Sequence, residues 1–205
     1  MPLETPWWTL VSAAAAPLAL IGGWMLAASR QSTHFDSIRG TISALAGRAA
    51  DDRWIMTSAL YILGACHGVT AFGLRSASCR GRCVLGFGGL CTLCVASLPL
   101  PASPLGSATG HLAFATVAFV CLTVWPLFAF RRGLDAPPVL RARVSVVASA
   151  ALAGLLAWLA LALRERVHVG LAERATAAAQ ALWPLAVVIA TRRHERESAV
   201  PTLPR

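Results

Sequence analysis

The chain has 205 residues, of which 57% are hydrophobic and 13% are charged, and its formal net charge is +9. Soluble domains carry about a quarter charged residues, so this chain has too few to cover the surface of a water-soluble globule. Lipid solvates an apolar exterior, and the composition therefore indicates a membrane protein. All the basic residues are Arg and lie between apolar stretches, where they meet lipid headgroups. We therefore expect membrane lipid, and no nucleic acid, as a partner.

Six apolar stretches follow one another along the chain, with lengths near the roughly 20 residues that cross a bilayer as a helix. They cover residues 8–29, 54–74, 83–98, 111–130, 144–163 and 171–191. We therefore predict an all-α, polytopic membrane helix bundle of about six transmembrane helices that forms a single domain over residues 1–191. Residues 192–205 are expected to form a polar, disordered cytoplasmic tail.

The distribution of Arg predicts the orientation of this bundle. With the N-terminus inside, 11 Arg residues fall in inner segments and seven fall in outer segments. Arg is enriched on the cytoplasmic side of membrane proteins, so both termini are expected in the cytoplasm. The use of Arg without Lys, in a chain rich in Ala, is typical of a GC-rich bacterial genome. The expected location is therefore a bacterial inner (plasma) membrane.

The longest polar segment, residues 30–53, lies outside in this orientation. Asp36 is a candidate helix cap, and the apolar residues Ile38, Ile42 and Leu45 recur at helical spacing. The segment therefore predicts a short amphipathic helix on the outer surface. Two interpretations stay open, a structured lid that only seals the bundle and a lid that covers a site.

Polar residues also recur at helical spacing near the outer ends of two predicted helices. They form two rows, Glu173, Thr176 and Gln180 on the last helix and Arg53, Thr57 and Tyr61 on the second. Polar groups at membrane depth normally face the bundle interior. With His111 at the start of the fourth helix, these rows predict a shared outward-opening cavity. We expect Glu173 to contact His111, Arg39 or Arg53 across the mouth of this cavity. The alternative is that end charges such as Asp51 and Asp52 only cap helices and meet headgroups.

The cysteines do not indicate a disulfide framework. Four of them lie in apolar stretches, and Cys79 and Cys83 lie in a segment expected in the reducing cytoplasm. The pair Cys91-x-x-Cys94 lies inside an apolar helix, where cysteine usually acts as a small apolar filler. His67 is expected to bond a neighbouring helix and not a metal. No cofactor and no metal site is predicted.

A series of motifs runs through nearly the whole chain. It consists of Asp36-Ser37-Ile38-Arg39-Gly40-Thr41-Ile42-Ser43-Ala44-Leu45, Trp54-Ile55-Met56-Thr57, Ser97-Leu98-Pro99, Gly110-His111, Trp125-Pro126 and Gly170-Leu171-Ala172-Glu173-Arg174. The series resembles the bacterial and archaeal membrane proteins grouped as domain of unknown function 998. That resemblance implies a six-helix membrane fold without implying an activity, and it singles out Asp36, Ser43, His111 and Glu173.

The first functional hypothesis is an outward-opening polar site for a lipid or isoprenoid substrate, and whether the protein is an enzyme is left open. In the sharpest version the site is of the membrane-bound terpene-cyclase type, with Asp36 or Glu173 as the acid and His111 as its partner. The substrate would contact Arg39, Ser43, Arg53, Thr57, Thr176, Gln180, Trp125 and Trp183. The rival hypotheses are a small transporter or lipid-translocating protein, and an accessory subunit of a membrane complex.

Overall fold

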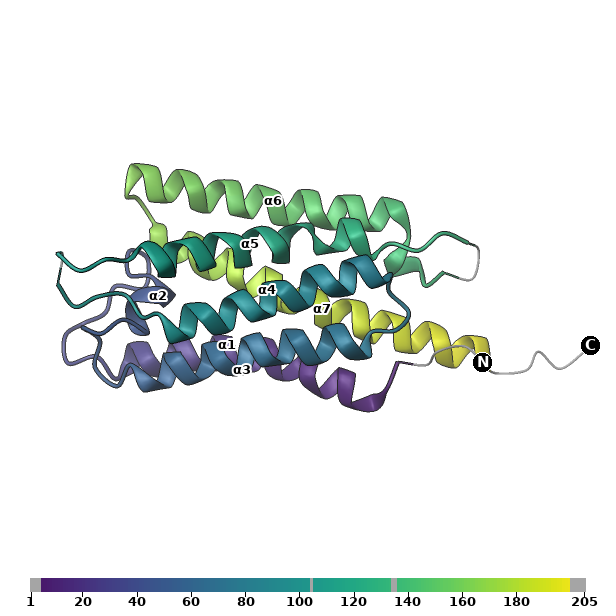
Figure 1. Ribbon diagram of the computed structural model, residues 1–205, viewed down its shortest axis with the longest axis horizontal. Coiled ribbons are helices and arrows are strands. Elements are labelled where there is room, and N and C mark those ends of the chain that lie inside the picture. Colours follow the sequence, from purple (N-terminus) through teal and green to yellow (C-terminus); the bar gives the residue numbers. More distant parts are fainter. Residues whose placement is uncertain (1–4, 104, 134–135, 200–205) are drawn as a thin grey trace, which may run out of the picture.

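The computed structural model describes residues 5–103, 105–133 and 136–199, and these residues are helical apart from the connecting loops. The elements are α1 (Trp7–Ser29), α2 (Ile42–Leu45), α3 (Trp54–Gly73), α4 (Cys79–Ser97), α5 (Thr109–Ala129), η1 (Pro138–Leu140), α6 (Ala142–Glu165) and α7 (Val169–Ala199). Figure 1 shows the six long helices lying side by side along one axis, with the short α2 at one end.

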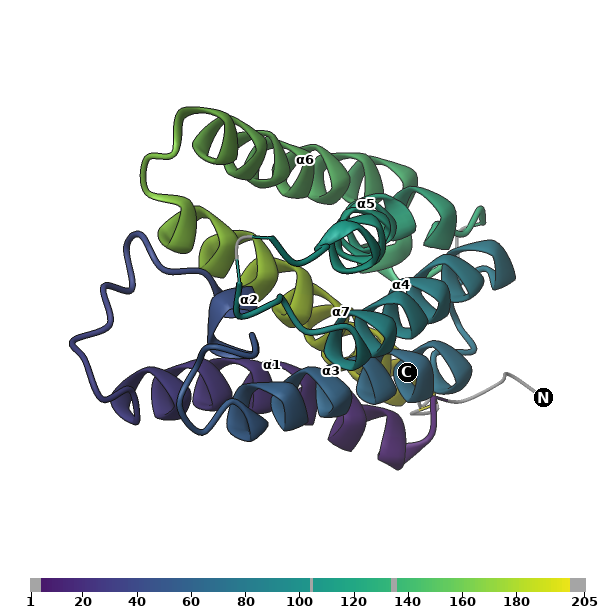
Figure 2. The same ribbon diagram turned by 60° about the vertical axis from the view of Figure 1, so that its left-hand side comes forward.

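The long helices pack in a closed ring. Each contacts its neighbour in the order α1, α3, α4, α5, α6 and α7, and α7 packs back against α1. In Figure 2, which looks more nearly along the helices, α7 lies toward the middle of the bundle, and it also touches α3 and α5. The short α2 contacts α1 and α7, so one end of the ring is covered between those two helices.

Five of these helices, α1 and α3 to α6, are long and apolar enough to cross a membrane in the part of the chain that the structure describes. The sixth, α7, runs beside them and extends past them at one end (Figure 1), and its polar residues Glu173, Thr176 and Gln180 are buried. Burial of the polar face leaves α7 an apolar exterior for lipid. The predicted fold class, a polytopic helical membrane bundle, is confirmed.

Two helices extend four or more residues beyond their predicted bounds. The fourth element, α4, begins at Cys79 and not at residue 83, and Arg82 in its first turn donates to the carbonyls of Ala71 and Phe72 at 2.7 Å. Arg82 therefore binds the end of α3.

The last helix, α7, continues to Ala199, so the predicted disordered tail is wrong up to that residue; residues 200–205 lie outside the described part. Hydropathy falls after residue 191, but no helix-breaking Pro occurs before Pro201. The extension is also tied to the start of α1, because the Glu195 carboxylate accepts from the Thr5 backbone N–H at 3.0 Å.

The segment that precedes α3 inserts into the end of the bundle and does not lie flat on its surface. Only Ile42–Leu45 is helical, with the Thr41 side chain as its cap. Ile42 and Leu45 are buried, whereas Ile38 is half-exposed. Asp36 caps a turn instead of a helix, since it accepts the backbone N–H of Ile38 at 2.9 Å. The predicted amphipathic helix is therefore shorter and more deeply seated than its periodicity suggested.

Candidate functional site

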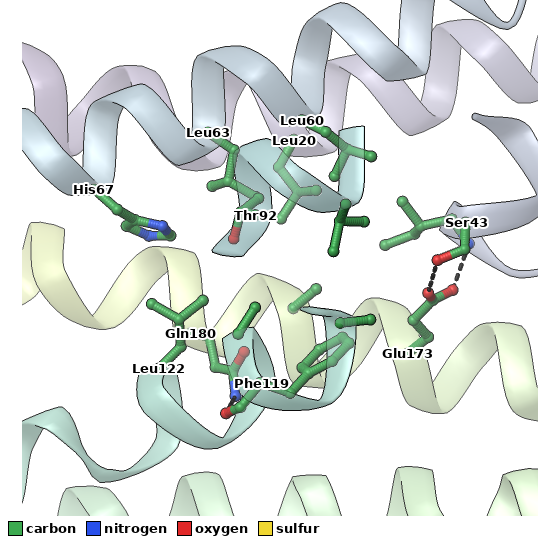
Figure 3. A pocket seen from close by; sticks show the side chains of 15 residues that line it. Leu20, Ser43, Leu60, Leu63, His67, Thr92, Phe119, Leu122, Glu173 and Gln180 are labelled. Carbon is green, nitrogen blue, oxygen red and sulfur yellow. Dashed lines mark hydrogen bonds between the residues drawn. The ribbon is translucent and has the colours of Figure 1, made fainter. Parts of the chain in front are cut away.

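A pocket lies inside the bundle between α1, α3, α4, α5 and α7, below α2 (Figure 3). Its cavity volume is about 60 Å³, and ten of its 15 lining residues are apolar. Five polar side chains face it, and they are Ser43, His67, Thr92, Glu173 and Gln180. In Figure 3, Ser43 and Glu173 lie at one end of the pocket and His67 at the other.

At the α2 end, the Glu173 carboxylate holds the α2 segment against α7. Glu173 lies in the first turns of α7 and is 7% exposed. One of its oxygens accepts the backbone N–H of Ile42, and the other accepts the Ser43 hydroxyl at 3.1 Å. Burying a carboxylate is costly unless hydrogen bonds compensate it. The first turn of α2 supplies those hydrogen bonds, and in exchange α2 is fixed over the pocket.

The neighbouring Arg174 holds the residues just before α2. One guanidinium nitrogen, Nη1, donates to the carbonyls of Ser37 at 2.8 Å and Gly40 at 2.7 Å. The guanidinium also lies over the rings of Trp24 and Phe35, with ring centroids 5.9 Å and 5.7 Å away. Cations over aromatic faces are attracted to them, more strongly when desolvated. Arg174 therefore also fixes the loop to α7.

The backbones of the two segments also meet directly. Leu171 donates its N–H to the Ile38 carbonyl at 3.1 Å. A Cβ on Gly170 would lie 2.1 Å from the Gly40 carbonyl oxygen, so only Gly fits there. We call this set of contacts, between residues 36–43 and 170–174, the α2 latch. It joins the first and last motifs of the series noted in the sequence, which are about 130 residues apart.

At the other end of the pocket, polar atoms lack partners. Among the described residues neither ring nitrogen of His67 has a hydrogen-bond partner, although the side chain is only 1% exposed. Gln180 uses its amide nitrogen to donate to the Phe119 carbonyl and the Thr123 hydroxyl, both at 2.9 Å. Its Oε1 has no partner in the same part of the chain. Thr92, in contrast, donates to the Gly88 carbonyl of its own helix at 2.9 Å.

The structure brings some of the predicted site residues together. Ser43, Glu173 and Gln180 line the pocket. Thr176 is buried on the same face of α7, as its spacing predicts, but its hydroxyl donates to the carbonyls of Leu155 and Ala172. Thr176 therefore ties α7 to α6 and does not line the pocket.

Other predicted residues lie away from the pocket. Asp36 and Arg39 are exposed and form an ion pair with each other at 3.7 Å. Arg53 is exposed on the surface, and Thr57 lies on α3 outside the lining. A charged side chain at the helix ends gains more from water than from an apolar interior, which explains why Asp36, Arg39 and Arg53 stay outside.

His111 and the two Trp residues have structural surroundings. His111 is buried, and its Nδ1 lies 2.8 Å from the Leu98 carbonyl, where it fastens the loop before α5. Trp125 and Trp183 belong to the cluster of packed side chains around Leu85 and Val188, outside the pocket lining. The predicted contact of Glu173 with His111, Arg39 or Arg53 is replaced by the contacts with Ile42 and Ser43.

His67 is the pocket residue that the sequence analysis assigned differently. It was expected to bond a neighbouring helix, and it faces the pocket instead (Figure 3). Gly64, about one helical turn before His67, packs closely against α4, where a Cβ would lie 2.7 Å from the Gly89 carbonyl oxygen.

The cysteines take no part in the pocket. All six are free thiols, and Cys79 and Cys83, one helical turn apart, have their sulfurs 4.0 Å from each other. In the described ranges no group of three His, Cys, Asp or Glu side chains is arranged to hold a metal ion. The polar lining therefore offers hydrogen bonds and one carboxylate.

Together, the ring of six long helices and the capped interior pocket define a polytopic helical membrane protein with a buried, mostly apolar site. The chain belongs to the family described as protein of unknown function (DUF998), whose model matches residues 13–190. This match confirms the resemblance drawn from the motif series. No curated protein and no solved structure matches the chain.

Proposed function

We propose that this protein binds a membrane amphiphile, a lipid or isoprenoid, in the interior pocket beneath α2. The observation that carries the proposal is an apolar pocket inside a membrane bundle with a few polar side chains at its two ends. Small-molecule sites typically have mostly apolar walls with a few polar groups that orient the ligand, and the lining of this pocket has that character. An apolar chain fits such walls, and the surrounding bilayer supplies such chains.

Binding is better supported than acid catalysis of the terpene-cyclase type. Asp36 is exposed, and both oxygens of Glu173 already accept hydrogen bonds from the α2 segment. A general acid must lie within hydrogen-bond reach of the atom that it protonates. Glu173 lines the pocket, but its hydrogen bonds to Ile42 and Ser43 would have to rearrange before it protonated a substrate there.

A small transporter or lipid-translocating protein is the second candidate, and the α2 latch is the observation that favours it. The latch closes one end of the pocket with a four-residue helix held by two adjacent charged residues. A short segment held by so few side chains is suited to open and close. Transport would require a second opening at the other end of the bundle.

The binding proposal is tested by filling the pocket. Ala115 lines it, so Ala115→Phe should displace the bound amphiphile; Ala113→Phe, on the exposed side of the same helix, is the matched control. We expect lipid extracted from the protein purified in nanodiscs to contain one enriched species, reduced about tenfold or more in Ala115→Phe. Mass spectrometry of the extracts measures this. Equal amounts of that species in both variants, or no enriched species, would contradict the proposal.

We also propose that the α2 end faces outward and both termini face the cytoplasm of a bacterial cell, because Arg is more frequent at the opposite end. Ala49 is exposed at the α2 end, and Cys79 and Cys83 are exposed at the other. Ala49→Cys, in a protein with Cys79→Ser and Cys83→Ser, should react with an impermeant thiol reagent in intact cells. The unsubstituted protein should react only after lysis, and the reverse pattern would invert the orientation.

A further inference from the structure

The two ends of the pocket differ in what they offer a ligand. At the α2 end the polar groups satisfy one another, because Glu173 accepts from Ile42 and Ser43. At the opposite end, where His67 lies and which we call the deep end, three buried atoms have no partner in the described residues. They are both ring nitrogens of His67 and Oε1 of Gln180. Buried polar atoms in native proteins are nearly always hydrogen-bonded, so such a group of exceptions needs an explanation. A ligand at the deep end supplies one.

The orientation of the Gln180 amide is fixed by its partners. The Phe119 carbonyl can only accept, so the Gln180 nitrogen must face it, and this nitrogen also donates to Thr123. The Oε1 atom is therefore available as an acceptor, and in Figure 3 it is turned away from Phe119. A neutral His67 ring adds one donor and one acceptor. The deep end thus offers one N–H and two acceptors to a ligand, without a charge.

The charges around the pocket argue against an anionic headgroup. Glu173 is the only ionisable lining residue besides His67, and it is at the α2 end. The nearest Arg in sequence, Arg174, does not line the pocket, and its Nη1 donates to the carbonyls of Ser37, Gly40 and Gly170. A phosphate placed beside His67 and Gln180 would be a buried charge without a partner, which is costly.

We propose that the ligand is an uncharged amphiphile that ends in a hydroxyl group and binds head-inward, with the hydroxyl between His67 and Gln180. This inference rests on the proposed function and deepens it. A hydroxyl has one donor and two acceptor sites, so it can donate to Oε1 of Gln180 and accept from the His67 N–H. The apolar chain then runs toward α2 along Leu20, Leu60 and Leu63, which line the pocket.

The binding test uses the full chain in nanodiscs and four probes of known chemistry. Farnesol and dodecanol carry a hydroxyl on an isoprenoid and on a straight chain; farnesyl diphosphate and phosphatidylglycerol carry anionic headgroups. We expect both alcohols to bind at least about tenfold more tightly than either anionic probe, which corresponds to one net hydrogen bond or more. Tighter binding of farnesol than dodecanol identifies an isoprenoid alcohol, and equal binding identifies hydroxyl-ended chains in general.

The variant His67→Phe tests the head-inward orientation. It keeps a ring of similar shape and removes both nitrogens, and since His67 has no partner in the described residues, the fold loses no hydrogen bond. We expect the variant to melt at or above the temperature of the unsubstituted protein while alcohol binding weakens about tenfold. The control is His111→Asn, which is outside the pocket and keeps a donor for the Leu98 carbonyl; its alcohol binding should be unchanged.

Three results would overturn the inference, and they differ in what they leave standing. Tighter binding of farnesyl diphosphate or phosphatidylglycerol than of the alcohols means that the head is anionic, and the pocket still binds an amphiphile. Unchanged alcohol binding by a folded His67→Phe variant means that the head does not lie at the deep end. If no probe binds and no species is enriched in the lipid extracts, the proposed function fails as well.

Discussion

Replacing Glu173 with Ala is expected to release the α2 segment from α7. The Ile42 N–H and the Ser43 hydroxyl both lose their acceptor in this variant. A buried donor left without a partner costs about 1–3 kcal/mol, and each 1.4 kcal/mol changes an equilibrium about tenfold. Amide hydrogen exchange across residues 37–46 should therefore become roughly 10–100 times faster. Mass spectrometry of the protein in nanodiscs measures the exchange.

Glu173→Gln is the matched control for this prediction. The Gln oxygen can accept the Ile42 N–H, and the Gln amide can donate to the Ser43 hydroxyl, which then acts as an acceptor. The latch should stay closed, with exchange close to that of the unsubstituted protein. If Glu173→Ala and Glu173→Gln accelerate exchange equally, the negative charge of the Glu173 carboxylate holds the α2 segment, through its attraction to Arg174. If neither does, Glu173 does not hold α2.

Comparing the Glu173→Ala and Glu173→Gln variants also tests the function of Glu173. If Glu173 acted as the acid of a reaction, Gln would abolish activity although the latch stays closed. If Glu173 only holds the lid, Gln should leave ligand binding nearly unchanged and Ala should change the rate at which ligand enters. The contacts with Ile42 and Ser43 favour the second outcome, because they occupy both oxygens of the carboxylate.

The helices could be predicted because a long apolar stretch of sequence is itself the physical cause of a membrane helix. An apolar run of about 20 residues has few stable alternatives to a membrane helix, since backbone groups in lipid must bond within the segment. The shared burial of Glu173 and Gln180 could be predicted for a related reason, because polar groups seven residues apart on a helix face the same way. These features depend on spacing along one helix, which the sequence displays.

The partners of the site residues could not be predicted in the same way. Glu173 bonds a backbone N–H of Ile42, and every non-proline residue has such a donor, so no side-chain pattern marks it. Charge complementarity suggested Arg39 or Arg53 instead. Both stay in water, where a charge is best solvated, and Arg39 pairs with Asp36. His67 was misassigned because the absence of a partner leaves no trace in the sequence.

Gly170→Ala is expected to open the latch from the backbone side. The added Cβ would lie 2.1 Å from the Gly40 carbonyl oxygen and 2.8 Å from the Ser37 carbonyl oxygen. Neither atom is the end of a flexible side chain, so the two segments must move apart. Their separation weakens the bond from Leu171 to Ile38 and the bonds from Arg174 to the same loop. Forcing a methyl group into packed structure typically costs about 1–3 kcal/mol.

The matched control is Gly154→Ala in the middle of α6, where a Cβ would have nothing within 4 Å. Ala is favoured over Gly inside a helix by about 0.5–1 kcal/mol, so this variant should melt at or slightly above the temperature of the unsubstituted protein. Gly170→Ala should melt lower, as followed by Trp fluorescence in nanodiscs, and should exchange faster across residues 37–46. Melting and exchange equal to those of Gly154→Ala would show that the first loop and the start of α7 do not meet at Gly170. The latch would then have to depend on the side chains of Glu173 and Arg174 alone.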